Sequence, residues 1–307
     1  MSEKLVGHCP HCGNEIEIPA HLQEFSCLYC GRRSHIDLLR NQQDFHKEDL
    51  EALASQLPGT LRDYKELYKH ITKKDYVKYF AQYEKEHSTF LRRLDCMVSA
   101  DPQGVEAASE TVCRVFLDTL DKDLQADKRY GRKNFATNVL FEIKVVLALF
   151  LSPLVRKLHL CMAEPFRNSL LRQWLERYPG ENWTPGDYDV IAGGFRKGNL
   201  CYITTAVCLR EGKADDCEEL QILRRFRDGW LRENGGEGLI EQYYDLAPSL
   251  VTLMDHCTNA EACYDSIRHG WIDPCLSALS RGEEELCRDI YVDMVRHLQA
   301  KYGQFKM

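Results

Sequence analysis

The stretch HCPHCGNEIEIPAHLQEFSCLYCGRRSH, residues 8–35, contains four cysteines in two Cys-x-x-Cys pairs. Cys9 and Cys12 form the first pair, Cys27 and Cys30 the second, and 14 residues (13–26) separate them. Two pairs at about this spacing are typical of a zinc ribbon. Four thiolates complete a tetrahedral shell with no open position for water, as in a structural site. The stretch therefore predicts one structural zinc ion on these four cysteines.

Neighbouring residues refine this prediction. Glycine follows the second cysteine of each pair and lets the turn close, so that backbone amides can point at the thiolates. The alternation in residues 15–18 before Pro19 predicts a short strand. With four thiolates available, we expect His8, His11 and His35 to be surface residues rather than ligands. The competing interpretation is a pair of redox Cys-x-x-Cys motifs, which normally belong to a larger fold.

Overall charge limits the class of partner. The 307 residues carry a formal net charge of -7, whereas general nucleic-acid coat proteins are usually basic. Arg32 and Arg33 follow the second cysteine pair and could contact phosphate. Nucleic-acid binding is therefore expected only through the ribbon, and protein is the expected partner.

The cysteine content bears on the compartment. The sequence has 14 cysteines, but no apolar segment typical of an export signal precedes Cys9. Reduced thiols in the cytoplasm are the better interpretation of this pattern. The most apolar run, residues 145–151, is too short for the roughly 20 residues of a membrane span. It predicts a buried core helix.

Beyond the ribbon, apolar residues recur at helical spacing. Residues 36–59 are predicted to form a polar helical connector. Pro248 is expected to kink the helix that contains it. Residues 201–208 are compatible with either a strand or a helix start. The predicted helices cover residues 61–71, 76–94, 105–124, 136–152, 164–177, 215–231, 239–256, 261–268 and 283–301.

The fold class that follows is mainly α, with a small β-rich zinc ribbon at the N-terminus. A parallel-sheet fold would need short apolar strands between the helices, and the sequence has none. Two prolines and five glycines fall within residues 178–199, which indicates a domain boundary or a functional loop. We predict a ribbon over 1–40, a helical bundle over 41–177 and a helical C-terminal domain over 178–307.

A set of motifs after residue 186 resembles a known bacterial family. Cys-Tyr-Ile-Thr-Thr-Ala begins at Cys201, Leu-Arg-Arg-Phe-Arg-Asp begins at Leu223, and a Tyr-Tyr pair with Ala-Pro follows from Tyr243. In this order the motifs resemble the CFI-box family, over about residues 187–256, with Tyr202 in place of the phenylalanine that gives the family its name. The closest layout is that of cytosolic members with an N-terminal zinc ribbon. The resemblance implies a domain boundary and assigns no activity.

The same block holds the remaining candidate site residues. Cys201 follows a glycine-rich loop and would open a helix, where the pKa of a thiol falls, so it is a candidate nucleophile with His256 as a helper. Cys201 could equally be a metal ligand or simply pack in the core. An inward arginine could hold a carboxylate, and a phenol could donate to a bound anion or pack in the core. The candidate binding residues are Arg224, Arg225, Arg227, Tyr243 and Tyr244.

Three functions compete. The first is an interaction or scaffold protein whose ribbon binds one partner and whose helical body binds another. The second is a cysteine-dependent enzyme centred on Cys201. The third is a metal or redox sensor that uses Cys201, Cys208 and Cys217. The absence of phosphate-loop, dinucleotide, serine-elbow and zinc-protease motifs favours the first.

Overall fold

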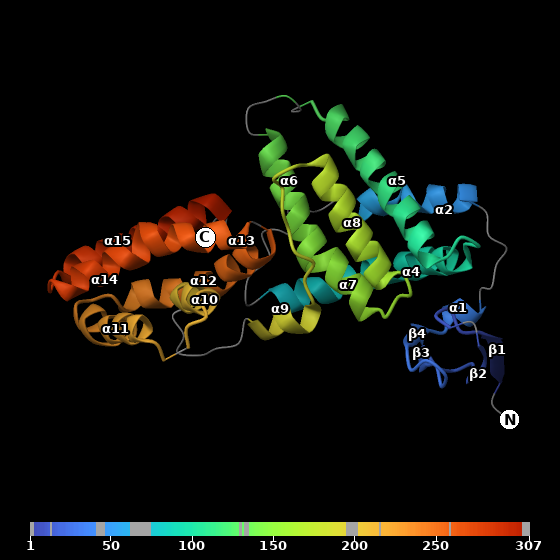
Figure 1. The fold of residues 1–307 in the computed structure, drawn as a ribbon, viewed down its shortest axis with the longest axis horizontal. Coiled ribbons are helices and arrows are strands. Elements are labelled where there is room, and N and C mark those ends of the chain that lie inside the picture. Colours follow the sequence, from blue (N-terminus) through green and yellow to red (C-terminus); the bar gives the residue numbers. More distant parts are fainter. Residues whose placement is uncertain are drawn as a thin grey trace. The chain divides into compact units, whose positions relative to one another are not determined.

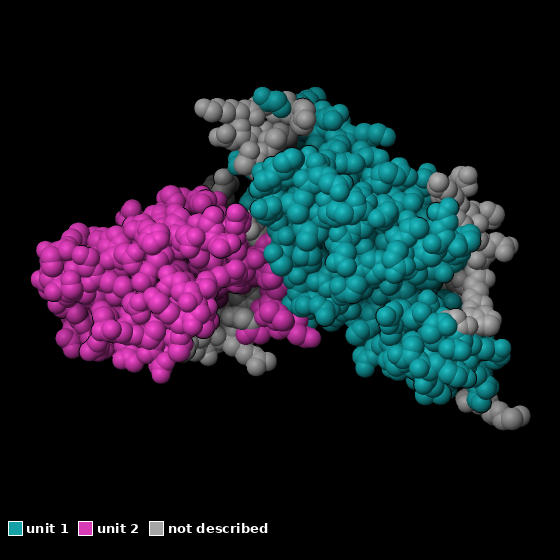
Figure 2. Space-filling view, in the orientation of Figure 1, with its two compact units in different colours: residues 1–65, 79–188 teal, residues 66–78, 189–307 magenta. Residues whose placement is uncertain are grey.

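The structure is a computed structural model. It describes residues 3–12, 14–40, 47–61, 75–128, 131, 135–194, 202–214, 216–257 and 259–302. In these residues helices dominate, and the strands form two small hairpins near the N-terminus (Figure 1). This architecture confirms the predicted fold class. The chain forms two compact units (Figure 2): unit 1 comprises residues 1–65 and 79–188, and unit 2 comprises residues 66–78 and 189–307.

Unit 1 begins with the two hairpins. Strand β1 (Lys4–His8) pairs antiparallel with β2 (Glu15–Pro19), which confirms the predicted strand. Strand β3 (Glu24–Ser26) pairs antiparallel with β4 (Arg33–His35). The hairpins enclose a small core of their own, made by Ile16, Ile18, Phe25, Ile36 and Leu39 together with Cys9 and Cys27.

The helical part of unit 1 follows. Short segments α1 (Asp37–Arg40), α2 (Lys47–Ala54) and η1 (Leu57–Leu61) lead into the long α4 (Tyr76–Ala100). The buried face of α4 includes Tyr76, Phe80, Tyr83, Leu91 and Leu94, as its helical spacing predicts. The bundle is completed by α5 (Val105–Ala126), α6 (Phe135–Val146), η2 (Leu147–Leu151), α7 (Ser152–Lys157) and α8 (Ala163–Arg177). The helix predicted over residues 61–71 falls almost entirely outside the described residues.

The centre of this bundle is the apolar run predicted to be buried. Every residue of η2, Leu147–Leu151, is fully buried. The segment Asn138–Lys157 is long and apolar enough to cross a membrane, but 78% of its most apolar window is buried inside the protein. Ser152 separates the π-turn η2 from Pro153: the Ser152 N–H donates to the Leu147 carbonyl, and Pro153 has no N–H to donate to the Ala148 carbonyl in the same pattern. The Ala148 carbonyl instead accepts a bond of 2.9 Å from the Gly186 N–H.

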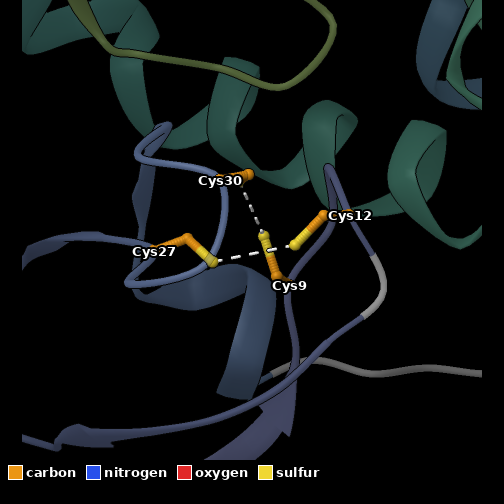
Figure 3. A group of neighbouring side chains, drawn as sticks. All are labelled: Cys9, Cys12, Cys27 and Cys30. Carbon is orange, nitrogen blue, oxygen red and sulfur yellow. Dashed lines mark hydrogen bonds between the residues drawn. The ribbon is translucent and has the colours of Figure 1, made fainter.

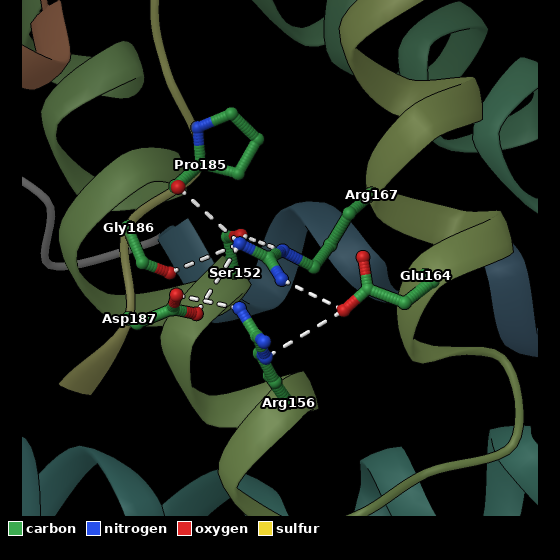
Figure 4. Close-up of polar contacts among 7 residues, drawn as sticks. All are labelled: Ser152, Arg156, Glu164, Arg167, Pro185, Gly186 and Asp187. Carbon is green, nitrogen blue, oxygen red and sulfur yellow. Dashed lines mark hydrogen bonds and ion pairs between the residues drawn. The ribbon is translucent and has the colours of Figure 1, made fainter. Parts of the chain in front are cut away.

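That bond is one of several that fix residues 178–187 on the bundle. The guanidinium of Arg167 is buried and donates to the Ser152 hydroxyl (2.8 Å), to the carbonyls of Pro185 and Gly186, and to the carboxylates of Glu164 and Asp187 (Figure 4). A buried arginine with this many acceptors holds together the segments that supply them. The described part of the glycine- and proline-containing stretch is therefore a packed strap rather than an open loop.

Unit 2 is wholly helical in its described residues. Residues 202–208, which the sequence left undecided between strand and helix, form a helix. Pro248 lies inside α12. Helix α15 packs against α12 and α14. The elements are α9 (Tyr188–Gly194), which begins at the unit boundary, α10 (Tyr202–Arg210), α11 (Glu218–Phe226), η3 (Arg227–Leu231), α12 (Glu237–Cys257), α13 (Ala260–Ile267), η4 (Arg268–Ile272), α14 (Asp273–Ser280) and α15 (Glu284–Tyr302).

Candidate metal centre

Each hairpin carries one Cys-x-x-Cys pair in its turn, and the two turns are built alike. The Cys9 N–H donates to the Asn14 carbonyl (2.8 Å), and the Cys27 N–H donates to the Arg32 carbonyl (2.9 Å). Gly31, directly after the second pair, has a φ of +71°, a left-handed conformation that favours glycine. The glycine after the second pair therefore has the turn-closing role that the sequence predicts.

The four sulfurs converge on one point between the turns (Figure 3). The Cys9 and Cys30 sulfurs are 3.8 Å apart, as are those of Cys12 and Cys27, and all four lie within 4.8 Å of one another. A disulfide would require about 2.05 Å. A tetrahedral shell with zinc–sulfur bonds of about 2.3 Å has sulfur–sulfur edges of about 3.8 Å. The observed separations match a metal shell, not disulfides.

Burial and hydrogen bonding show why a cation suits this cluster. Cys9 and Cys27 are buried, whereas Cys12 and Cys30 are exposed. Burial raises the pKa of the Cys9 thiol to about 12, while the Asn14 backbone N–H lowers the pKa of Cys12 to about 6. The Tyr29 N–H points at the Cys27 sulfur at 3.4 Å. A divalent cation among the sulfurs would offset the cost of burying thiolate charge.

The predicted ligand set is thus brought together, and it can hold a metal ion. Among the described residues, no second group of three or more Cys, His, Asp or Glu side chains is close enough to do so. The sulfurs fill all four positions of a tetrahedron, so the shell leaves no site for substrate or water.

The ribbon is joined to the helices of unit 1 by a histidine whose position the sequence did not reveal. His35 was expected at the surface, but it is fully buried, and that prediction is wrong. Its Nε2 lies 2.7 Å from the Asp95 carboxylate of α4. Asp95 also accepts the backbone N–H groups of Cys161 (3.1 Å) and Met162 (2.8 Å). One buried carboxylate therefore links β4, α4 and the segment before α8.

The predicted arginine cluster of unit 2 does not act as a single group. Arg225 is exposed and donates to the Gln221 carbonyl within its own helix. Arg224 is half-buried. Arg227 is buried, forms two hydrogen bonds of 2.7 and 2.6 Å to Asp228, and lies 5.7 Å from the ring centre of Tyr244. Of the three arginines, Arg227 is the one that is buried.

The two tyrosines have packing roles. The Tyr243 hydroxyl accepts the Ile203 N–H at 2.9 Å, which satisfies a backbone donor in the first turn of α10. The Tyr243 ring packs against those of Tyr244 (5.9 Å between centres) and Tyr291 (5.5 Å). These contacts connect the Tyr-Tyr motif to the Cys-Tyr-Ile motif and to α15.

Of the three candidate cysteines of unit 2, Cys208 and Cys217 lie in the described part of the chain. Cys201 lies outside the described residues, so its role stays a prediction. Cys208 is fully buried and lies in one cluster with Leu220 and the half-buried Cys217. Burial and the neighbouring Cys217 raise the pKa of Cys208 to about 12. His256 is half-buried in the last turn of α12.

Two features of the structure were not predicted from the sequence. Leu28 and Tyr29, between the cysteines of the second pair, are 92% and 67% exposed. The exposure of Leu28 and Tyr29 could have been predicted. In a Cys-x-x-Cys turn the two cysteines face the metal, so the two residues between them must face away from it. The second feature is a cavity in unit 2 that includes Arg227 and Tyr243.

Comparison with known proteins gives no match, whether to protein-family models, to curated proteins or to solved structures. The resemblance of residues 187–256 to the CFI-box family is therefore still a prediction, carried by the three motifs alone.

Proposed function

We propose that the four-cysteine cluster holds one structural zinc ion and that the protein is an intracellular interaction protein. In this proposal the zinc-stabilised ribbon binds a partner protein, and the helical body serves as its scaffold. The cytoplasmic location and membership of the CFI-box family belong to the same proposal. The observation that carries it is the closed shell of four sulfurs beneath an exposed apolar turn.

The exposed turn at Leu28 and Tyr29 is the reason to expect a protein partner. Leu28 and Tyr29 sit between two metal ligands, so the metal would prevent the turn from folding these side chains inward. Large apolar side chains held together in water are typical of protein interaction sites. Tyrosine is also enriched among the residues that dominate binding energy at interfaces. A partner with an apolar recess fits this surface better than a phosphate backbone does.

Arg32 and Arg33, next to the turn, are exposed and contact neighbouring side chains. Arg33 contacts His159 at 3.3 Å and Glu24 at 4.0 Å, and Arg32 contacts His11 at 3.5 Å. A nucleic-acid site would depend on such basic side chains reaching phosphates. Both arginines are exposed and these contacts are long, so the preference for a protein partner rests on the exposed Leu28 and Tyr29.

The test uses the full chain with a photo-crosslinking residue at position 28 in cells. A crosslinked protein that also binds the purified chain, and that is lost with Leu28→Ser/Tyr29→Ser, would support the proposal. The matched control is Val77→Ser, which alters an exposed apolar residue of α4. Crosslinks to nucleic acid alone, or a partner that binds the double variant equally well, would overturn it.

A second candidate function is thiol-based sensing, favoured by the adjacency of Cys208 and Cys217. Oxidation would form a Cys208–Cys217 disulfide, with glutathione disulfide as the oxidant and reduced glutathione as the product. Mass spectrometry of tryptic peptides after this treatment tests the idea. A Cys208–Cys217 linkage that dithiothreitol reverses would support it, and unlinked peptides would exclude it.

A further inference from the structure

Unit 2 contains a cavity of about 330 Å³ that the proposed function does not use. The cavity lies between α11 with η3, α12 and α15, and α15 packs against both α12 and η3. Its volume falls within the roughly 300–1,000 Å³ range of small-molecule sites. All of its lining residues belong to unit 2, so the cavity is independent of the ribbon.

Its walls are mainly aliphatic and aromatic. Leu223 and Phe226 come from α11, Ile240 from α12 and Val292 from α15. A wall of this kind favours an apolar ligand body, because burying that body removes its surface from water.

Its charged groups are all of one sign. The lining includes Arg227, Arg288 and Arg296 and no carboxylate. Arg227 and Arg288 are each paired with the aspartate that follows them in sequence, Asp228 and Asp289. Both aspartates point to solvent, with 49% and 66% of their side chains exposed. The lining itself therefore presents guanidinium groups and no carboxylate, which suits a negatively charged ligand.

Polar neutral groups complete the lining. Gln242 and Gln299 contribute amides to the lining, and Tyr243 contributes a phenol. The guanidinium group of an arginine can donate two parallel hydrogen bonds to one carboxylate. An apolar cavity with these donors is complementary to an amphipathic acid.

We propose that this cavity binds a small amphipathic carboxylate with a single unbranched or aromatic apolar tail, such as a medium-chain fatty acid. The tail lies against Leu223, Phe226 and Ile240, and the carboxylate is bound by the arginines. No bond is made or broken, and the site is one of binding. This inference goes beyond the proposed interaction role and holds whether or not the ribbon binds a partner.

Isothermal titration calorimetry on the full chain tests it, with decanoate, decanol and decyltrimethylammonium as probes below their micelle-forming concentrations. We expect saturable 1:1 binding of decanoate, at least tenfold weaker binding of decanol and none of the cation. Equal affinity for decanol and decanoate would overturn the charge argument. Absence of saturable binding of any probe would overturn the site itself.

Three variants locate the binding. Arg296→Gln, which changes an exposed lining arginine, is expected to weaken decanoate binding about tenfold and to leave decanol binding unchanged. Val295→Trp fills the cavity and is expected to abolish both. Arg225→Gln is the matched control, since this arginine is exposed on α11 and is not part of the lining. If Val295→Trp folds, as judged by circular dichroism, and still binds decanoate, the proposal is wrong.

Discussion

Replacement of Asp95 by alanine is predicted to be among the most destabilising single changes outside the cysteines. The Asp95 carboxylate is fully buried and accepts three hydrogen bonds: His35 Nε2 at 2.7 Å, the Cys161 N–H at 3.1 Å and the Met162 N–H at 2.8 Å. Asp95→Ala would leave three buried donors without an acceptor. Each such donor costs about 1–3 kcal/mol, and removal of one partner of a buried charged pair typically costs about 3–5 kcal/mol in total, which is the loss we expect in the free energy of unfolding.

Urea unfolding followed by circular dichroism measures this loss, with zinc in excess for every variant. Asp123→Ala, which removes an exposed carboxylate of α5, is the matched control and is expected to change the free energy by less than about 0.5 kcal/mol. A double-mutant cycle with His35→Ala isolates the bond between ribbon and body, with an expected coupling of about 1.5–3 kcal/mol. If Asp95→Ala destabilised the protein no more than Asp123→Ala, the role assigned to this carboxylate would be refuted.

Two further predictions concern charged groups elsewhere. Arg167→Met is expected to destabilise unit 1 by about 3 kcal/mol, because the Ser152 hydroxyl and the Pro185 and Gly186 carbonyls lose their arginine donor, while Glu164 and Asp187 keep only Arg156. Limited proteolysis should then cut residues 178–187 first, and unchanged proteolysis would contradict this. Lys213 lowers the pKa of Glu219 from its usual 4.5 to about 2, so the stabilisation by this carboxylate should be present above pH 4.5 and lost as the pH falls towards 2. Hydrogen exchange of α11 should therefore show protection that declines in the wild type as the pH falls from 4.5 to 2. In Glu219→Gln this decline should be smaller. Equal acid sensitivity in both proteins would contradict the role given to Glu219.

Local sequence patterns were sufficient for the ribbon and for most helices. The ligand set of Cys9, Cys12, Cys27 and Cys30 could be predicted because its spacing encodes the two turns directly. The α4 stripe and the buried run of η2 could be predicted because burial follows the helical period. The helix Asp273–Ser280 was not predicted.

Features that depend on distant partners could not be predicted in this way. His35 is buried beside Asp95, which lies sixty residues later in the sequence and accepts a hydrogen bond from its ring Nε2. Arg225, in α11, is exposed and Arg227, in η3, is buried, although they are only two residues apart and α15 packs against η3. The cavity joins the arginine motif to residues near 290 that carry no motif of their own. Each of these depends on packing between elements, which periodicity does not encode.

The central claim, that Cys9, Cys12, Cys27 and Cys30 hold one zinc ion, is tested most directly by metal content per chain. Elemental analysis would compare the wild type with Cys27→Ala/Cys30→Ala, and with Cys96→Ala as a control outside the cluster. We predict one zinc per chain in the wild type and in Cys96→Ala, falling to about none in the double variant. A wild type without metal, or a double variant that keeps its zinc, would contradict the account.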